Sequence, residues 1–197
     1  MVWNNLKDLS LENHRVSLRR INATDFDAFA KIAFDEEIWR YFVLRISTRE
    51  QLTAFIDSAI QDTLNGTRIV FAVIDNAAGQ IVGSTAYGNM SEKERKLEIG
   101  WSWLSRAAQG NGINRAAKFL LLEHAFGKLS CERVEFKTDV LNMRARAGLK
   151  ALGASEEGIL RSFNDMPDGR RRDVVYYSIL ASEWPKLRTD RFHNYIG

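Results

Sequence analysis

The sequence predicts a mixed α/β fold, that is, an α+β domain built around a mixed sheet. Strand and helix patterns follow one another in the order β, α, α, β, β, β, α, β, α, β, β, which is not the strict alternation of a doubly wound protein. Hairpins are expected near both ends, and only the strand–helix–strand unit around residues 103–138 requires parallel pairing. The 197 residues, 45% of them hydrophobic, suit one domain with a sizeable core.

The elements follow from the spacing of apolar residues. Alternating or β-branched segments predict seven strands, at residues 15–20, 67–74, 81–88, 94–104, 132–138, 155–163 and 171–181. Helical spacing predicts four helices, at residues 25–33, 48–64, 112–126 and 142–152. Thr24 and Thr48 are expected N-caps, whereas Gly66 and Gly153 are expected to end helices.

Composition excludes several classes of protein. A net charge of +3 is too weak to indicate nucleic acid as the main partner, and the apolar runs are too short to cross a membrane. One cysteine, Cys131, excludes an internal disulfide framework, and residues 1–10 lack the apolar core of a secretory signal. The three histidines lack metal-ligand spacing, so no metal is expected. We expect a cytoplasmic protein with a single domain over residues 1–197, a core over about 16–181 and a C-terminal tail over 182–197.

A loop with two glycines joins a strand to a helix at residues 109–114. Gly110 and Gly112 would let the backbone approach a ligand closely, and the first amides of the helix have no partner within it. Those amides and the helix dipole favour a bound anion such as a diphosphate. Ile113 and Asn114 stand where a P-loop requires Lys and Ser or Thr, and Arg115 replaces the third glycine of a dinucleotide fingerprint.

This loop resembles the acetyl-CoA loop of the GNAT superfamily of acetyltransferases, whose pattern is Gln/Arg-x-x-Gly-x-Gly/Ala. The first position holds Ala107, which departs from the pattern, and Arg106 and Gln109 flank it. Further segments resemble the Rim-type branch, the ribosomal-protein N-terminal acetyltransferases; they are residues 97–101, 121–126, 133–135, 142, 152–154, 157–161 and 173–179. The likeness extends over about residues 16–181.

The resemblance implies a sheet whose two central parallel strands, residues 94–104 and 132–138, splay apart to admit acetyl-CoA. It places the cofactor against one set of residues: Trp101, Trp103, Leu104, Gln109, Gly110, Asn111, Gly112, Ile113, Asn114, Asn142 and Arg146. Trp101, Trp103 and Leu104 would contribute backbone to the pantetheine arm. Arg146 could reach a phosphate, but a solvated helix face suits it equally well.

Glu98 is the candidate general base, because it lies in an apolar run of the central strand and burial makes a carboxylate more basic. Regular alternation puts Leu97, Ile99, Trp101 and Trp103 together on the face opposite Glu98. Relatives carry a bulge in this strand; Gly100 could host one here, which would bring Trp101 to the Glu98 side. The alternative is a salt-bridged structural glutamate.

The proton donor for the leaving thiolate is harder to assign. Relatives place a tyrosine seven residues after the asparagine, or a serine three residues after it, and these positions hold Leu149 and Ala145. Asn142 is therefore the candidate that assists, with a proton from solvent or from another residue as alternatives. Tyr176 and Tyr177 lie on a late strand and are more typical of an aromatic core.

Trp39, Tyr41 and Trp101 are the candidate acceptor-binding residues, since in relatives the region between the first two helices lines the acceptor site. Core packing suits Trp39 equally well. The expected reaction is direct acetylation of a primary amine, at a protein or peptide N-terminus. One alternative is that the acceptor is a small amine, such as an aminoacyl conjugate, an antibiotic or a polyamine. The other is that the protein is a non-catalytic acyl-CoA-binding module. Relatives are often homodimers.

Overall fold

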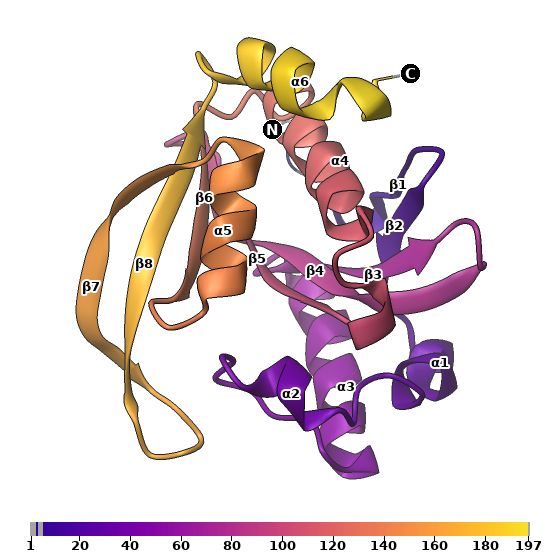
Figure 1. The fold of residues 1–197 in the computed structure, drawn as a ribbon. Helices are drawn as coiled ribbons and strands as arrows, with labels where there is room; N and C mark the ends of the chain where they lie inside the picture. The colour runs from indigo at the N-terminus through magenta and orange to yellow at the C-terminus, as the bar shows by residue number, and fades with distance from the viewer. Residues whose placement is uncertain (1–2, 4–5, 197) are drawn as a thin grey trace.

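The computed structural model describes residues 3 and 6–196. Within them, eight strands form one sheet in the order β1-β2-β3-β4-β5-β6-β8-β7 (Figure 1). Their bounds are β1 Leu11–Glu12, β2 Val16–Arg20, β3 Ile69–Asp75, β4 Gln80–Ser91, β5 Lys96–Leu104, β6 Arg133–Asp139, β7 Ser155–Asp165 and β8 Arg171–Leu180. Among the described strands β5 and β6 form the one parallel pair, and they are joined by the strand–helix–strand unit from which parallel pairing was predicted. The mixed fold class is confirmed.

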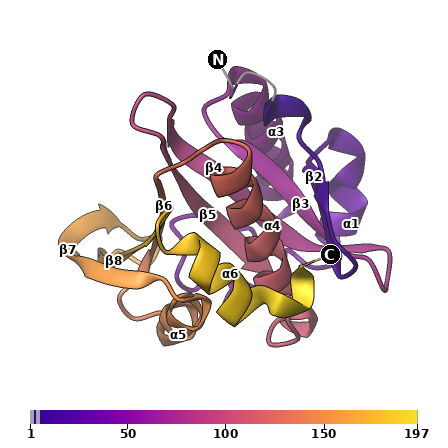
Figure 2. The same ribbon diagram turned by 90° about the horizontal axis from the view of Figure 1, so that it is seen from above.

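Helices cover both faces of the sheet. One face carries α1 (Phe26–Ala30), α2 (Glu36–Trp39) and α3 (Arg49–Asn65), and the other carries α4 (Ile113–Gly127), α5 (Met143–Leu152) and α6 (Trp184–Phe192), as Figures 1 and 2 show. Each face has its own apolar cluster, in which Phe29, Ile56 and Trp103 lie on the α3 side and Leu97, Leu121 and Tyr177 on the α4 side.

The ends of the helices follow local hydrogen bonding. Thr48 caps α3 in a capping box with Gln51, and Gly66 ends the helix at φ +70°, which confirms both predictions. The prediction of Thr24 as a cap is wrong. Asn22 accepts the Thr24 amide at 3.1 Å and donates its own amide to the Asp25 carboxylate at 2.9 Å, so a 3-10 turn starts earlier and α1 follows it.

A β-bulge interrupts β5. Ala86 pairs with Gly100 and Ser84 with Trp103, so the residue between them on β4 faces two residues on β5, and Trp101 adopts φ +50°. The regular alternation considered for this strand is therefore wrong beyond Ile99. The bulge turns Trp101 and Trp103 to the face of Glu98, against the α3-side cluster.

Residues 184–195 fold back over the α4 face as α6 and a 3-10 turn. Trp184 and Phe192 are buried in the α4-side cluster with Phe119. This segment therefore packs against the core and covers part of it. No helix in the described part of the chain is both long and apolar enough to span a bilayer.

Candidate active site

The two central strands diverge. β5 and β6 pair only at Lys96 with Arg133, Leu97 with Val134 and Glu98 with Glu135, although β5 continues to Leu104 and β6 to Asp139 (Figure 1). Beyond Glu98 the β6-facing backbone edge of β5 has no strand partner among the described residues. An extended group with amide bonds could pair with that edge, as a strand added to a sheet does.

The loop after β5 leads directly into the 15-residue helix α4. Gly110 and Gly112 have φ +79° and +90°, which explains glycine at both positions. Asn111 Oδ1 accepts the Ile113 amide at 3.3 Å, while the amides of Asn114 and Arg115 have no partner among the described residues. These free amides and the helix dipole make this end of α4 suitable for an anion.

Arg144 of α5 contacts the loop between β5 and α4. Its guanidinium donates to Gln109 Oε1, and Gln109 Nε2 donates to the Leu104 carbonyl at 2.8 Å. Arg146, the arginine proposed from the sequence, instead donates to Tyr177 Oη at 3.2 Å and pairs with Glu156 at 3.3 Å. Helical spacing from Asn142 pointed to Arg146, whereas the long Arg144 side chain reaches the loop from the first turn of α5.

Asn142 is the N-cap of α5, because its Oδ1 accepts the Ala145 amide at 3.0 Å. It also lines a hollow of about 350 Å³ together with Tyr41, Gln109 and Arg144. Leu149, further along α5, is buried, and its aliphatic side chain cannot donate a proton to the leaving thiolate. Asn142 therefore caps α5 and also borders the hollow.

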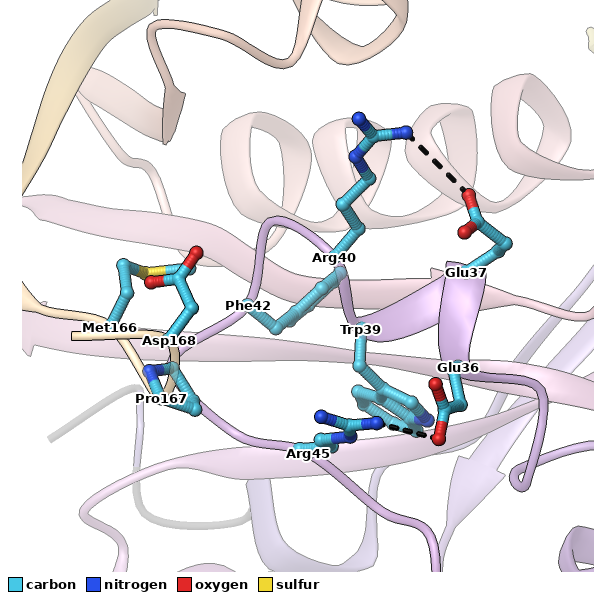
Figure 3. A pocket seen from close by; sticks show the side chains of 9 residues that line it. All are labelled: Glu36, Glu37, Trp39, Arg40, Phe42, Arg45, Met166, Pro167 and Asp168. Atoms are coloured by element: carbon cyan, nitrogen blue, oxygen red, sulfur yellow. Dashed lines mark ion pairs between the residues drawn. The ribbon is translucent and has the colours of Figure 1, made fainter. Parts of the chain in front are cut away.

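A second hollow, of about 240 Å³, also borders α2 (Figure 3). Trp39 and Phe42 line it opposite the β7–β8 hairpin residues 166–168, and Glu37 and Arg40 line both hollows. Trp39 is 4% exposed and its Nε1 donates to the Ala33 carbonyl at 2.7 Å. Trp39 thus packs in the core although it borders this hollow, whereas Tyr41 lines the first hollow.

Glu98 is 2% exposed and sits where the strands begin to diverge. Its Oε2 accepts from Asn89 Nδ2 at 2.7 Å and from Lys137 Nζ at 3.1 Å. The Lys137 ammonium also lies 5.7 Å from the centroid of the Trp101 ring and 5.6 Å from that of the Phe163 ring. The ammonium compensates the buried carboxylate charge, as the salt-bridged alternative for Glu98 requires. Lys137 was not singled out in the sequence, because only the fold brings it to Glu98.

Cys131 and His124 are in environments that do not suit a nucleophile or a general acid or base. Burial raises the pKa of the Cys131 thiol to about 12, which leaves it protonated and unreactive. Burial lowers the pKa of His124 to about 4, so its ring is neutral at pH 7. The described residues contain no group of three or more His, Cys, Asp or Glu side chains placed to hold a metal ion.

The sequence model of the Acetyltransferase (GNAT) domain family matches residues 15–155. This chain belongs to the GNAT family. It is 36% identical to the ribosomal N-acetyltransferase-like protein YdaF of Bacillus subtilis (strain 168), over 54% of this chain and 57% of that protein. A solved GCN5-related N-acetyltransferase from Brucella melitensis is 26% identical with a TM-score of 0.85, over 92% of this chain and 83% of that one.

The structure of RimJ from Mycobacterium smegmatis, solved with CoA-disulfide, has a TM-score of 0.78 over 90% of each chain. At 24% identity, that likeness shows the fold alone. The family and the assignment as an N-acetyltransferase are therefore confirmed. GNAT enzymes use acetyl-CoA.

Proposed function

We propose that this GNAT protein transfers the acetyl group of acetyl-CoA directly to the primary amine of a protein or peptide N-terminus. The observation that carries the proposal is the meeting of two features at the end of β5. The unpaired β5 edge suits the amide-containing pantetheine arm, and the free amides of Asn114 and Arg115 suit the diphosphate. The name of the relative YdaF supports a ribosomal protein as the acceptor.

Glu98 is the proposed base. Within the described residues both of its hydrogen bonds go to Oε2, which leaves Oε1 to accept a proton from the acceptor amine through water. The β5 bulge places Trp101 on the same face, so the base and an aromatic wall border one space. A β5 backbone amide near the bulge would polarise the thioester carbonyl.

Three consecutive acidic residues at the start of α2, the cluster Asp35, Glu36 and Glu37, test the alternative of a polyamine acceptor. A polyamine site requires acidic side chains free to bind ammonium groups. Here Asp35 caps α2 by accepting the Glu37 amide, Glu36 pairs with Arg45 at 2.5 Å, and Glu37 pairs with Arg40 at 3.8 Å (Figure 3). These partners neutralise the cluster, which favours a peptide over a polyamine.

The test is a panel of N-terminal peptides, polyamines and aminoacyl conjugates, read by release of the CoA thiol. We expect peptides, including the N-termini of ribosomal proteins, to be acetylated on the α-amine, as mass spectrometry of the products would show. We expect Glu98→Gln to lower kcat by about 100-fold or more, the usual contribution of a general base.

Glu94→Gln is the matched control, since Glu94 is an exposed glutamate in the turn before β5. It should leave turnover unchanged. Full activity of Glu98→Gln with every accepted amine would refute the role of the base, and release of thiol only with polyamines would refute the peptide acceptor.

A further inference from the structure

A lysine is buried under the bulge of β5. Lys118, in the middle of α4, is 5% exposed, and no carboxylate of the described residues lies within ion-pair distance of it. Its Nζ donates to Ser102 Oγ at 2.6 Å and approaches Thr85 Oγ1 at 3.5 Å. Burying an ammonium without an anion is costly, so such a group calls for a functional explanation.

The surroundings of Lys118 make its proton easy to release. Burial lowers the pKa of Lys118 to about 7, and the negative charge of Glu98 on β5 opposes part of that effect. On β4, burial raises the pKa of Tyr87, which keeps that phenol neutral, and the ring of Phe136 on β6 lies 5.9 Å from Nζ. Near neutral pH, Lys118 can therefore both hold a proton and give it up.

Ser102 connects this lysine to the space between the diverging strands. It is the second residue of the bulge and is half-buried, whereas Thr85 and Lys118 are buried. Its Oγ lies 2.8 Å from Thr85 Oγ1 and 3.1 Å from the Gly100 carbonyl. A short chain of polar atoms thus runs from the buried ammonium to the hydroxyl of Ser102, a half-buried residue of β5 beyond its pairing with β6.

We propose that Lys118 and Ser102 supply the proton that the leaving thiolate of CoA requires, taking the place of the acid that Leu149 and Ala145 do not provide. Ser102 is the group that meets the sulfur, and Lys118 acts through it. This inference rests on the proposed function, because it assumes that the thioester lies at the β5 bulge.

The step is balanced. The acceptor nitrogen forms its bond to the acetyl carbon and gives a proton to Glu98, and the carbon–sulfur bond breaks with its electron pair on sulfur. Sulfur takes the Ser102 hydroxyl proton, and that hydroxyl takes one from the Lys118 ammonium. Lys118 is left as a neutral amine, a form that its burial favours. Return of the Glu98 proton through solvent to Lys118 resets the site.

The first test needs no acceptor. CoA is bound to the wild type and to Lys118→Met, Ser102→Ala and Lys128→Met, and ultraviolet absorbance of the thiolate is followed against pH. The Ser102 hydroxyl, held by its hydrogen bond from Lys118, should donate to the thiolate and so favour the ionised form. We therefore expect the bound thiol to ionise at lower pH in the wild type and in Lys128→Met than in the other two variants. Lys128 is exposed at the end of the same helix. Identical ionisation in all four proteins would overturn the proposal.

The second test is turnover. We expect Lys118→Met and Ser102→Ala each to lower kcat by roughly 100-fold, with little change in KM for acetyl-CoA, and the double variant to lose no more than either single one. The wild-type fall in kcat above about pH 7 should be absent from Lys118→Met. Full turnover of Ser102→Ala, which keeps Lys118 in place, would refute the relay even if Lys118→Met failed to fold. Failure of the wild type to bind CoA would instead refute the proposed function, and this inference with it.

Discussion

At the scale of single residues, buried charges gather around the diverging strands. Glu98 pairs with Lys137, and the fully buried Asp139 at the end of β6 pairs with Arg170 at 2.6 Å. Arg172 Nε also lies 3.6 Å from the Asp139 carboxylate. Among the described residues, the hydrogen-bond partners of the Lys118 ammonium are all hydroxyls. Paired charges hold their elements in one arrangement, because a buried charge that loses its partners is costly.

Nearer the surface, Glu157 of β7 accepts from Arg133 Nη1 at 2.6 Å and from Ser178 Oγ at 2.8 Å. The hydrogen bond from Arg133 holds the pKa of Glu157 at about 2, below its usual 4.5. A depressed carboxyl pKa stabilises the fold above pH 4.5, and this stabilisation is lost as the pH falls towards 2.

We therefore expect Glu157→Gln to lower the free energy of unfolding at pH 7 by about 1 kcal/mol, a figure reduced for the partial exposure of the pair. The difference from the wild type should vanish by about pH 2, as urea unfolding at several pH values would show. A difference independent of pH would mean that the ion pair contributes nothing.

At the scale of elements, the bulge of β5 sets the site. Gly88 on the neighbouring strand leaves room for the Trp101 ring, since a Cβ there would lie 2.3 Å from a ring atom. A Cβ on Gly100 would lie 2.8 Å from Glu98 Oε1. Asn89 and Lys137 hold that carboxylate in place, so it cannot move away without losing a hydrogen bond.

Gly100→Ala should therefore displace the Glu98 carboxylate and lower kcat about tenfold or more, since small displacements of catalytic groups are costly. Gly148→Ala is the matched control. Gly148 lies in α5 with open space around it, and alanine there should stabilise the helix by roughly 0.5–1 kcal/mol and leave kcat unchanged. Equal kcat for both variants and the wild type would contradict the importance of the bulge.

At the scale of the whole molecule, α6 completes the core that carries α4. The Trp184 ring packs against Phe126 and Phe192, with centroids 5.5 Å away in both cases, and its Nε1 donates to Glu123 of α4 at 3.2 Å. Tyr195 Oη lies 3.4 Å from the Gly112 carbonyl at the start of α4. The C-terminal segment thus supports the helix whose first amides face the proposed diphosphate site.

Trp184→Ala should lower the free energy of unfolding by about 3–5 kcal/mol, the usual cost of removing a buried large aromatic side chain. Lys186→Ala, on the exposed side of the same helix, removes only a surface pair with Asp190 and should cost no more than about 0.5 kcal/mol. Chemical unfolding measures both, and similar values would mean that α6 adds little to the core.

Local patterns were enough to predict most of the strands and longer helices, as well as the glycine loop. Thr48 and Gly66 were recognised because capping depends on residues within one turn of each other. The four-residue helix α2 was missed, since it is too short to show helical periodicity. For the site, the sequence indicated Glu98, Asn142 and the loop amides as candidates. Arg144 and Lys137 went unrecognised, because their partners lie 35 and 39 residues away in the chain.

By itself the sequence determined the order of the elements, the turn at Gly110 and Gly112 and the family, because backbone sterics and apolar spacing act over a few residues. The tertiary structure was needed to show that β5 and β6 part after Glu98, that the bulge in β5 forms at Trp101 and Ser102, and that Lys118 lies beneath Ser102. Those features depend on which strand or helix each residue meets, and long-range packing, rather than local preference, fixes that choice.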